Sequence, residues 1–204
     1  MGKGPLIILS GPSGSGKSTV LGQLLASGDL PLRLSVSATT RAPRPGERDG
    51  VDYHFWDRAR FEKELAADGF LESAEVHGNY YGTLRREVEP FRDRGVGAIL
   101  DIDVQGWRQV RQRCPEVVSI FLRAPSLEAY EQRLRARGTE TEASLKRRLD
   151  AARAEIAHAQ EYDYEVINDD LEMAVRRLRD VVETILRATP HKADQERGYS
   201  CTKN

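Results

Sequence analysis

The amino-acid sequence predicts an α/β fold in which helices flank a parallel β-sheet. Apolar runs bounded by turn residues alternate with amphipathic stretches along most of the 204 residues, which is the pattern of strands joined by helices. The first apolar run leads through a glycine-rich turn directly into a helical pattern. Hydrophobic residues make up 39% of the chain and charged residues 31%, so we expect a soluble protein with one domain and a lid or insert.

Strands are predicted where short apolar runs are bounded by turn residues. These runs are 6–10, 33–37, 70–76, 97–103, 117–122 and 164–168. The run 70–76 alternates like a half-buried strand, whereas 6–10 and 97–103 are almost continuously apolar and predict buried strands. The segment 78–82 is rich in turn residues and is expected to be a loop.

Helices are predicted between these strands. Their ranges are 16–26, 57–67, 83–94, 126–137, 139–160 and 170–188. Asp57 is the expected N-cap of the second helix, which Gly69 ends, and Pro90 is expected to break or kink the third. Thr139 and Glu142 have capping-box spacing at the start of the fifth helix.

The bulk composition excludes several classes of function. The formal net charge is -1, so no whole-protein field attracts nucleic acid or a membrane, and any recognition of anions must be local. Cys114 and Cys201 are far apart and lack the CxxC or histidine companions of a zinc site or disulfide framework. The apolar run 6–9 is too short for a signal peptide or a membrane span, and we expect a cytoplasmic location.

A phosphate-binding pattern follows the first predicted strand and opens the first predicted helix. The pattern G-x-x-x-x-G-K-[ST] is matched by Gly11, Pro12, Ser13, Gly14, Ser15, Gly16, Lys17 and Ser18. Its glycines let backbone N–H groups point at phosphate oxygens, its lysine reaches the β- and γ-phosphates, and its serine hydroxyl can bind Mg²⁺. A merely flexible turn is the alternative, but it does not account for this position between strand and helix. The segment predicts binding of a nucleoside triphosphate.

The phosphate loop alone does not choose among GTPases, ATPase motors and small-molecule kinases. The guanine-reading N-K-x-D pattern of switch GTPases is absent from the sequence, and an ATPase motor usually belongs to a longer chain. A second substrate site must therefore decide between these classes.

Two carboxylates, Asp101 and Asp103, end the predicted strand 97–103. Strand alternation places both side chains on one face of the sheet. A carboxylate at the end of a strand beside a phosphate loop is the usual second contact to Mg²⁺, directly or through water. The alternative is that these acids only solvate the strand end or cap a helix.

Arg41 and Arg44 lie on a polar segment, 39–50, that Pro43 and Pro45 stiffen. Regular structure is not expected there, and long ordered loops usually serve a function. A stiff loop loses less entropy when it presents two guanidinium groups to one phosphate. The alternative is a solvated basic loop.

Seven segments together resemble the guanylate kinase family. They include the phosphate loop, the segment S-V-S-A-T-T-R-A-P-R and the segment G-N-Y-Y-G-T. In the order of the family, they are 10–19, 35–44, 50–55, 78–83, 100–106, 137–140 and 166–170. The resemblance implies a P-loop NTPase core with a parallel sheet, an inserted GMP-binding subdomain with a small mixed β-sheet, and a helical lid.

The resemblance covers residues 4–187 and implies boundaries for these parts. The core comprises 4–34, 97–125 and 163–187, the insert 35–96 and the lid 126–162. The remaining tail, 188–204, is polar and aperiodic and is expected to be disordered.

The resemblance also implies which residues bind GMP. They are Ser37, Arg41, Arg44, Tyr53, Glu72, Tyr81, Thr83 and Asp103. The arginines and tyrosines look like a clamp on the monophosphate, and Glu72 looks like the carboxylate that reads guanine. An ionised carboxylate only accepts hydrogen bonds. The N1/C2 edge of guanine offers two adjacent donors, whereas the same edge of adenine offers none. Without the resemblance, Glu72 reads as a solvent-facing strand acid.

On the ATP side, the resemblance adds Thr19, arginines of the lid, and Asn168, which looks like a contact to the adenine or ribose of ATP. Arg133, Arg137 and Arg148 look like the groups that close over the triphosphate and, with Lys17 and Arg41, stabilise the transferring phosphoryl group. Arg147 is the alternative to Arg148. Ser18 and Asp101 are the implied contacts to Mg²⁺.

The implied reaction is ATP + GMP ⇌ ADP + GDP with Mg²⁺, in a monomer or homodimer that binds neither nucleic acid nor membrane. A monophosphate oxygen is already nucleophilic, so no dedicated general base is required. Two alternatives stay open: a kinase for another monophosphate, and an inactive guanylate-kinase-like module that binds phosphopeptides.

Overall fold

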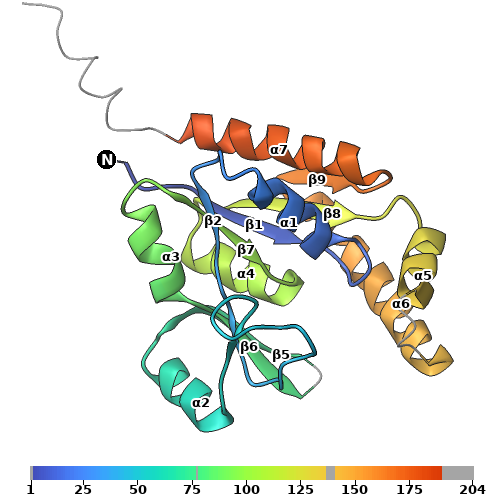
Figure 1. Cartoon of the computed structure of the whole chain (residues 1–204), viewed down its shortest axis with the longest axis horizontal. Helices are drawn as coiled ribbons and strands as arrows, with labels where there is room; N and C mark the ends of the chain where they lie inside the picture. Colours follow the sequence, from blue (N-terminus) through green and yellow to red (C-terminus); the bar gives the residue numbers. More distant parts are fainter. Residues whose placement is uncertain (1, 77, 137–140, 190–204) are drawn as a thin grey trace, which may run out of the picture.

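Five parallel strands form the central sheet, in the order β2-β7-β1-β8-β9 (Figure 1). Their bounds are β1 Leu6–Ser10, β2 Leu32–Leu34, β7 Gly97–Asp101, β8 Val118–Arg123 and β9 Tyr164–Ile167. The structure, a computed structural model, describes residues 2–76, 78–136 and 141–189. β1 pairs with β7 on one side and β8 on the other, so the strand that carries the phosphate loop lies at the centre. The predicted parallel sheet is confirmed.

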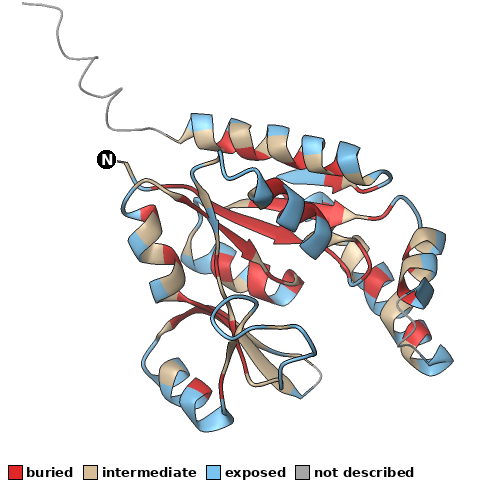
Figure 2. Cartoon of the chain, in the orientation of Figure 1, coloured by how far each residue is buried: buried red, intermediate tan, exposed pale blue. Residues whose placement is uncertain are grey.

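Helices cover both faces of this sheet, as the fully buried β1 requires. Ile7 and Leu9 point to the face covered by α1 (Lys17–Ala26) and α7 (Leu171–Ala188). Leu6 and Ile8 point to the other face, where α3 (Arg85–Arg92) and α4 (Val104–Arg113) supply buried side chains. Figure 2 shows the buried residues concentrated on the central strands between these helices.

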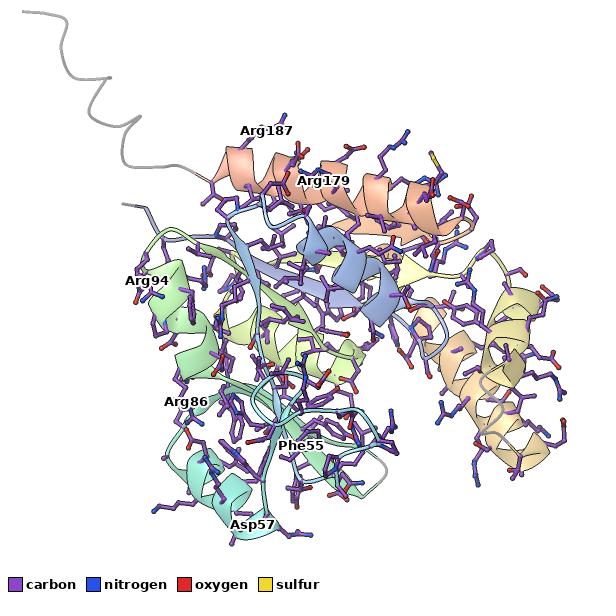
Figure 3. All side chains as sticks on the ribbon, viewed as in Figure 1. Phe55, Asp57, Arg86, Arg94, Arg179 and Arg187 are labelled. Atoms are coloured by element: carbon purple, nitrogen blue, oxygen red, sulfur yellow. The ribbon has the colours of Figure 1, made fainter. Side chains whose placement is uncertain are left out.

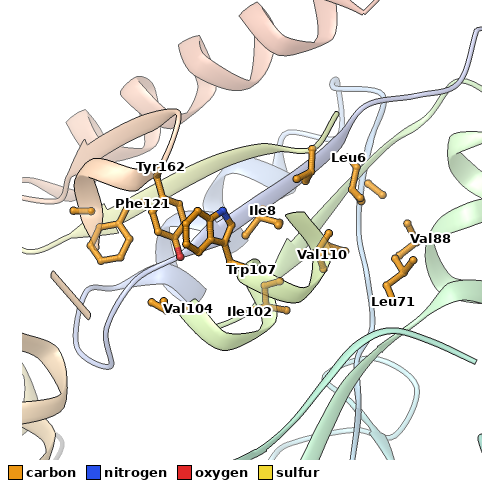
Figure 4. Packing of buried hydrophobic residues seen from close by; sticks show 14 residues of the cluster. Leu6, Ile8, Leu71, Val88, Ile102, Val104, Trp107, Val110, Phe121 and Tyr162 are labelled. Carbon is orange, nitrogen blue, oxygen red and sulfur yellow. The ribbon is translucent and has the colours of Figure 1, made fainter. Parts of the chain in front are cut away.

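The centre of the second face is aromatic. Trp107 of α4 stacks on Tyr162, with ring centroids 4.3 Å apart, and Tyr162 also packs against Phe121 of β8 (Figure 4). This cluster joins α4 to the segment that leads from helix α6 (Glu142–Ile156) into β9, so it fixes α4 against the end of the sheet.

A second, smaller sheet lies entirely within residues 38–84, in the order β4-β3-β6-β5. Its strands are β3 Ala38–Thr39, β4 His54–Phe55, β5 Phe70–Val76 and β6 Asn79–Leu84. β3 pairs with β4 in parallel, whereas β6 is antiparallel to both β3 and β5. The sheet is therefore mixed, and with α2 (Arg58–Ala66) it encloses a separate hydrophobic core.

Two further helices, α5 (Leu127–Ala136) and α6 (Glu142–Ile156), connect β8 to the short helix η1 (Ala159–Glu161) that precedes β9. They contact each other and project from one end of the molecule (Figure 1). Within the described ranges, no helix is long and apolar enough to cross a membrane.

Most predicted elements are present, but several boundaries were wrong. Residues 79–82 of the predicted loop 78–82 belong instead to β6, because the turn is limited to Gly78 (φ 79°) on this side and the tyrosines after it pair with β5. The predicted strand 33–37 stops at Leu34 and the chain resumes as β3 in the other sheet. Helix α4 was not predicted at all. Pro90 is accommodated inside α3.

Helix caps account for other differences. Asp57 caps α2 as predicted, accepting a hydrogen bond from the backbone N–H of Arg60. The N-cap of α6 is Thr141, whose hydroxyl accepts from the N–H of Ser144 at 3.2 Å, so the predicted capping box began two residues too early. Thr139 itself lies outside the described residues, as does most of the predicted tail.

The separate core of the small sheet predicts a large effect of Phe61→Ala. Phe61 is fully buried and stacks on Phe70, with centroids 4.5 Å apart. We expect the substitution to lower the free energy of unfolding by about 3–5 kcal/mol, measured by urea denaturation. The matched control is Leu65→Ala on the same helix, because Leu65 is 48% exposed; it should change stability by less than about 0.5 kcal/mol. Equal effects of the two substitutions would contradict this assignment of the core.

Candidate active site

The phosphate loop joins β1 to α1 at the carboxyl end of the central strand. Gly11 (φ 149°) and Gly16 (φ 92°) adopt backbone conformations that favour glycine. A Cβ on Gly11 would lie 2.0 Å from the carbonyl oxygen of Leu122, and one on Gly16 would lie 2.3 Å from Nδ2 of Asn168. Only glycine fits at both positions. The strand–loop–helix context predicted for residues 11–18 is confirmed.

Lys17, the first residue of α1, lies between the loop and the neighbouring strand. Its Nζ donates to the carbonyl oxygen of Gly11 at 2.5 Å and lies 3.9 Å from Oδ1 of Asp101. The register of the sheet brings these groups together, because Leu9 of β1 pairs with Asp101 of β7. Burial raises the pKa of Asp101, and the positive charge of Lys17 lowers it.

Asp103 lies beyond the strand and caps the next helix. β7 ends at Asp101, and Oδ1 of Asp103 accepts a hydrogen bond from the N–H of Gly106 at 2.9 Å, at the start of α4. The strand alternation predicted for 97–103 therefore stops before Asp103, and helix capping is what this carboxylate does. Both aspartates still line one cavity.

Two adjoining cavities open between the phosphate loop and the small sheet. The larger has a volume of about 460 Å³ and includes Ser18, Arg41 and Arg44 in its wall. The smaller has a volume of about 190 Å³ and includes Lys17, Glu72 and Asp103. The residues that line both are Ser37, Tyr53, Tyr81 and Asp101. Seven of the eight residues predicted to bind GMP are thus brought together, the exception being Thr83.

Arg41 is surrounded by groups that fix its guanidinium. Nη1 donates to the carbonyl oxygen of Ala42 at 2.7 Å and Nη2 to Oε1 of Glu47 at 2.9 Å. The guanidinium carbon lies 5.6 Å from the ring centroid of Tyr53 and 5.7 Å from that of Phe55, which lies among the side chains of the small sheet (Figure 3). Burial raises the pKa of Tyr53 to about 12, so its hydroxyl stays protonated and able to donate.

Glu72 is a buried carboxylate in the wall of the smaller cavity, with 5% of its surface exposed. Its Oε1 accepts two hydrogen bonds from Thr83, one from the backbone N–H at 2.9 Å and one from the hydroxyl at 2.7 Å. Oε2 has no hydrogen-bond partner in the described part of the chain, and a Cβ on Gly106 would lie 2.7 Å from it. Burial raises the pKa of Glu72 to about 7, although the hydroxyl of Thr83 lowers it.

Thr83 holds Glu72 and does not line either cavity. It is fully buried, and its hydroxyl is donated to the carboxylate. A direct contact between Thr83 and a nucleotide base stays a prediction.

The arginines of α5 and α6 contact the phosphate loop. Arg133 donates to the carbonyl oxygen of Ser15 at 3.2 Å and to that of Asn168 at 2.7 Å. Arg148 donates to the hydroxyl of Ser13 at 3.2 Å, which favours Arg148 over Arg147 as the lid residue. Arg137 lies outside the described residues.

Asn168 is also turned toward the phosphate loop. It follows β9, is 5% exposed, and its Nδ2 donates to the carbonyl oxygen of Ser15 at 2.7 Å. The predicted contact of Asn168 with adenine or ribose stays a prediction. Thr19, in the first turn of α1, donates its backbone N–H to the carbonyl oxygen of Gly16.

Sequence reasoning missed Glu47, which contacts the predicted phosphate clamp. The available signal was local: an acid three residues after Arg44, across the turn-forming dipeptide Pro45-Gly46.

The chain is similar in sequence to known proteins of one family. The model of the guanylate kinase family matches residues 3–185. A guanylate kinase of Nitrosococcus oceani is 49% identical over 181 residues, which cover 89% of this chain and 89% of that protein. A guanylate kinase of Vibrio cholerae is 45% identical over 197 residues, covering 96% of this chain and 93% of the relative.

The fold agrees as well. The crystal structure of guanylate kinase from Anaplasma phagocytophilum has a TM-score of 0.74 and 37% identity, covering 92% of this chain and 86% of that chain. The family resemblance and the α/β fold class predicted from sequence are both confirmed. By sequence and by fold, the chain belongs to the guanylate kinase family.

Proposed function

We propose that this protein transfers the γ-phosphoryl group of ATP to GMP, giving ADP and GDP. One observation carries the proposal: a buried carboxylate, Glu72, and a two-arginine clamp line adjoining cavities that meet beside Lys17 and Asp101. In this proposal, Glu72 reads the base and the two arginines bind the phosphate, next to the phosphate loop. That is the arrangement that a transfer between two nucleotides requires.

Glu72 supplies the preference for guanine. Its ionised carboxylate accepts the two donors of guanine, N1–H and the exocyclic amine, and adenine has no such pair. A base that cannot donate leaves the carboxylate buried without compensation, so the wrong nucleotide is rejected strongly. Thr83 fixes one oxygen and thereby the orientation of the carboxylate.

Arg41 and Arg44 bind the acceptor monophosphate, while Lys17 and the lid arginines neutralise charge on the donor phosphates. The chemistry asks the protein for alignment and charge, because the attacking oxygen of GMP is already nucleophilic. The contacts of Arg133 and Arg148 with the phosphate loop support this role of the proposed lid.

Mg²⁺ is the expected cofactor, and two residues fit it. The hydroxyl of Ser18 and the carboxylate of Asp101 line the same cavity, and both are oxygen ligands of the kind that Mg²⁺ prefers. Across the described ranges, no cluster of three or more His, Cys, Asp or Glu could hold a metal, so water and ATP phosphates supply the remaining ligands. When bound, the ion neutralises charge on the transferring group.

The alternative of an inactive phosphopeptide-binding module is not favoured. Lys17 and Ser18 are both in place at the strand–helix junction, and the relatives reported above are named as kinases.

Glu72→Gln tests the reading of guanine. The amide presents one donor and one acceptor, so it opposes one of guanine's two donors with a donor of its own. We expect kcat/KM for GMP to fall by about 100-fold or more, with no comparable loss for AMP, in a coupled ADP-release assay. Glu75→Gln, an exposed position on the same strand, is the matched control and should behave like the unsubstituted protein. An unchanged preference for GMP over AMP in Glu72→Gln would refute the assignment.

The pKa of Glu72 predicts a pH dependence of GMP binding. The carboxylate is the accepting form, so the affinity for GMP should fall as the pH decreases through about 7, at most about tenfold per pH unit. The measurement is KM for GMP between pH 5.5 and 8.5, in steps of about half a unit. Glu72→Gln should not show this pH dependence. The comparison separates the titration of Glu72 from the titration of GMP itself. If KM for GMP changes with pH equally in both proteins, Glu72 is not the titrating group.

Lys17→Ala tests the donor site. Loss of this charge from the transferring phosphates should lower kcat by at least about 10²–10³-fold, while the melting temperature changes little. The fold tolerates the change because Asp101, whose pKa is already raised, can take up a proton. Lys3→Ala is the control, since Lys3 pairs with Asp93 at the surface. Retained turnover in Lys17→Ala would contradict the proposed donor site.

A further inference from the structure

Glu47 joins the backbone of the 41–53 loop to an arginine of the phosphate clamp. Its Oε1 accepts from Nη2 of Arg41 at 2.9 Å, and its Oε2 accepts from the backbone N–H of Arg44 at 2.7 Å. The side chains of Glu47 and Arg41 are only 19% and 16% exposed. One carboxylate therefore holds both arginine positions of the clamp.

The position of Glu47 is set by a turn. Its backbone N–H donates to the carbonyl oxygen of Arg44 at 3.0 Å, and the residues between are Pro45 and Gly46, with φ 88° at the glycine. Proline followed by a glycine with positive φ is the signature of a type II turn. The turn thus fixes the backbone of Glu47 without the help of an arginine side chain.

Two other acids of the same loop accept hydrogen bonds from backbone N–H groups only. Asp49 accepts from the N–H of Phe55 at 2.8 Å, and Asp52 accepts from the N–H of Arg48 at 2.7 Å. Both stabilise the loop backbone. Among the described residues of this loop, Glu47 alone adds a bond to an arginine side chain that lines the larger cavity.

We propose that Glu47 is a positioning residue for the acceptor phosphate, which orients the guanidinium of Arg41 and fixes the backbone at Arg44 before GMP binds. This inference rests on the proposed function, in which Arg41 and Arg44 bind the phosphate of GMP. Glu47 acts through the arginines and does not itself touch the nucleotide.

The alternative is that Glu47 occupies the place of the phosphate and must be displaced. The donor count favours positioning. A guanidinium has five N–H groups. Ala42 and Glu47 each accept from one of them, and the hydroxyl of Tyr81 also hydrogen-bonds to Arg41, so two N–H groups are left for phosphate. Arg41 also keeps the pKa of Glu47 below its usual range, so the ion pair persists at neutral pH. Orientation set in advance lowers the entropy lost on binding.

The two readings predict opposite signs for variants of Glu47. Glu47→Gln keeps one acceptor oxygen and can hold only one of the two donors, whereas Glu47→Ala holds neither. If Glu47 positions the clamp, kcat/KM for GMP should fall by about 10-fold in Glu47→Gln and about 100-fold in Glu47→Ala, with KM for ATP unchanged. Glu62→Gln, which removes an exposed charge paired with Arg58 on α2, is the control and should leave both parameters unchanged.

A double-mutant cycle with Arg41→Ala completes the test. If Glu47 acts through Arg41, Glu47→Ala should lose most of its effect in the Arg41→Ala background. A rise in kcat/KM for GMP in Glu47→Gln, or an effect of Glu47→Ala that is undiminished in that background, would overturn the inference. If Arg41→Ala itself leaves GMP kinetics unchanged, the proposed acceptor site fails instead. Thermal unfolding of each variant, expected to differ little from the unsubstituted protein, separates these outcomes from loss of fold.

Discussion

The close packing of the phosphate loop against the ends of two neighbouring strands is the constraint on which the site depends. Gly11 touches the backbone at Leu122, the end of β8, and Gly16 touches Asn168, just after β9. Parallel strands bring all their carboxyl ends to one edge, so the loop, Asp101 and the lid helices that follow β8 must meet there. A residue larger than glycine at either position would displace the loop from Asp101 and from the helices that follow β8.

The proposed acceptor half of the site depends on a different feature, the buried carboxylate of Glu72, only one oxygen of which has a hydrogen-bond partner in the described part of the chain. Burial raises the pKa of Glu72 and so disfavours the ionised carboxylate, but the two hydrogen bonds that Thr83 donates to one oxygen lower the pKa again. The pKa of Glu72 therefore lies near 7. Its carboxylate gains most from a ligand that donates to the second oxygen as well as to the first. The small sheet can support this because its own aromatic core, built around Phe61 and Phe70, holds β5 and β6 in register.

Sequence patterns located what is local and failed where the environment is assembled from distant segments. The phosphate loop was predictable because its strand, turn and helix are contiguous. Glu72 was not predictable from its own strand, since its burial depends on Thr83 eleven residues later and on Gly106 of α4. Asp103 shows a third case: an acid after an apolar run fits a strand end and a helix cap equally well. Asp103 is a helix cap because α4 begins directly after it, and the sequence pattern did not predict α4.

The cations at the centre of the site already have protein partners. Lys17 bonds to Gly11 and approaches Asp101, Arg41 pairs with Glu47, and Arg133 bonds to two backbone carbonyls. A phosphate that binds here therefore exchanges one partner for another or uses the donors left over, and the net gain in free energy is a difference between similar terms. What such pairing secures is orientation. Phosphoryl transfer depends on the alignment of two nucleotides far more than on tight binding of either, so a site built from pre-oriented, already paired charges suits that chemistry.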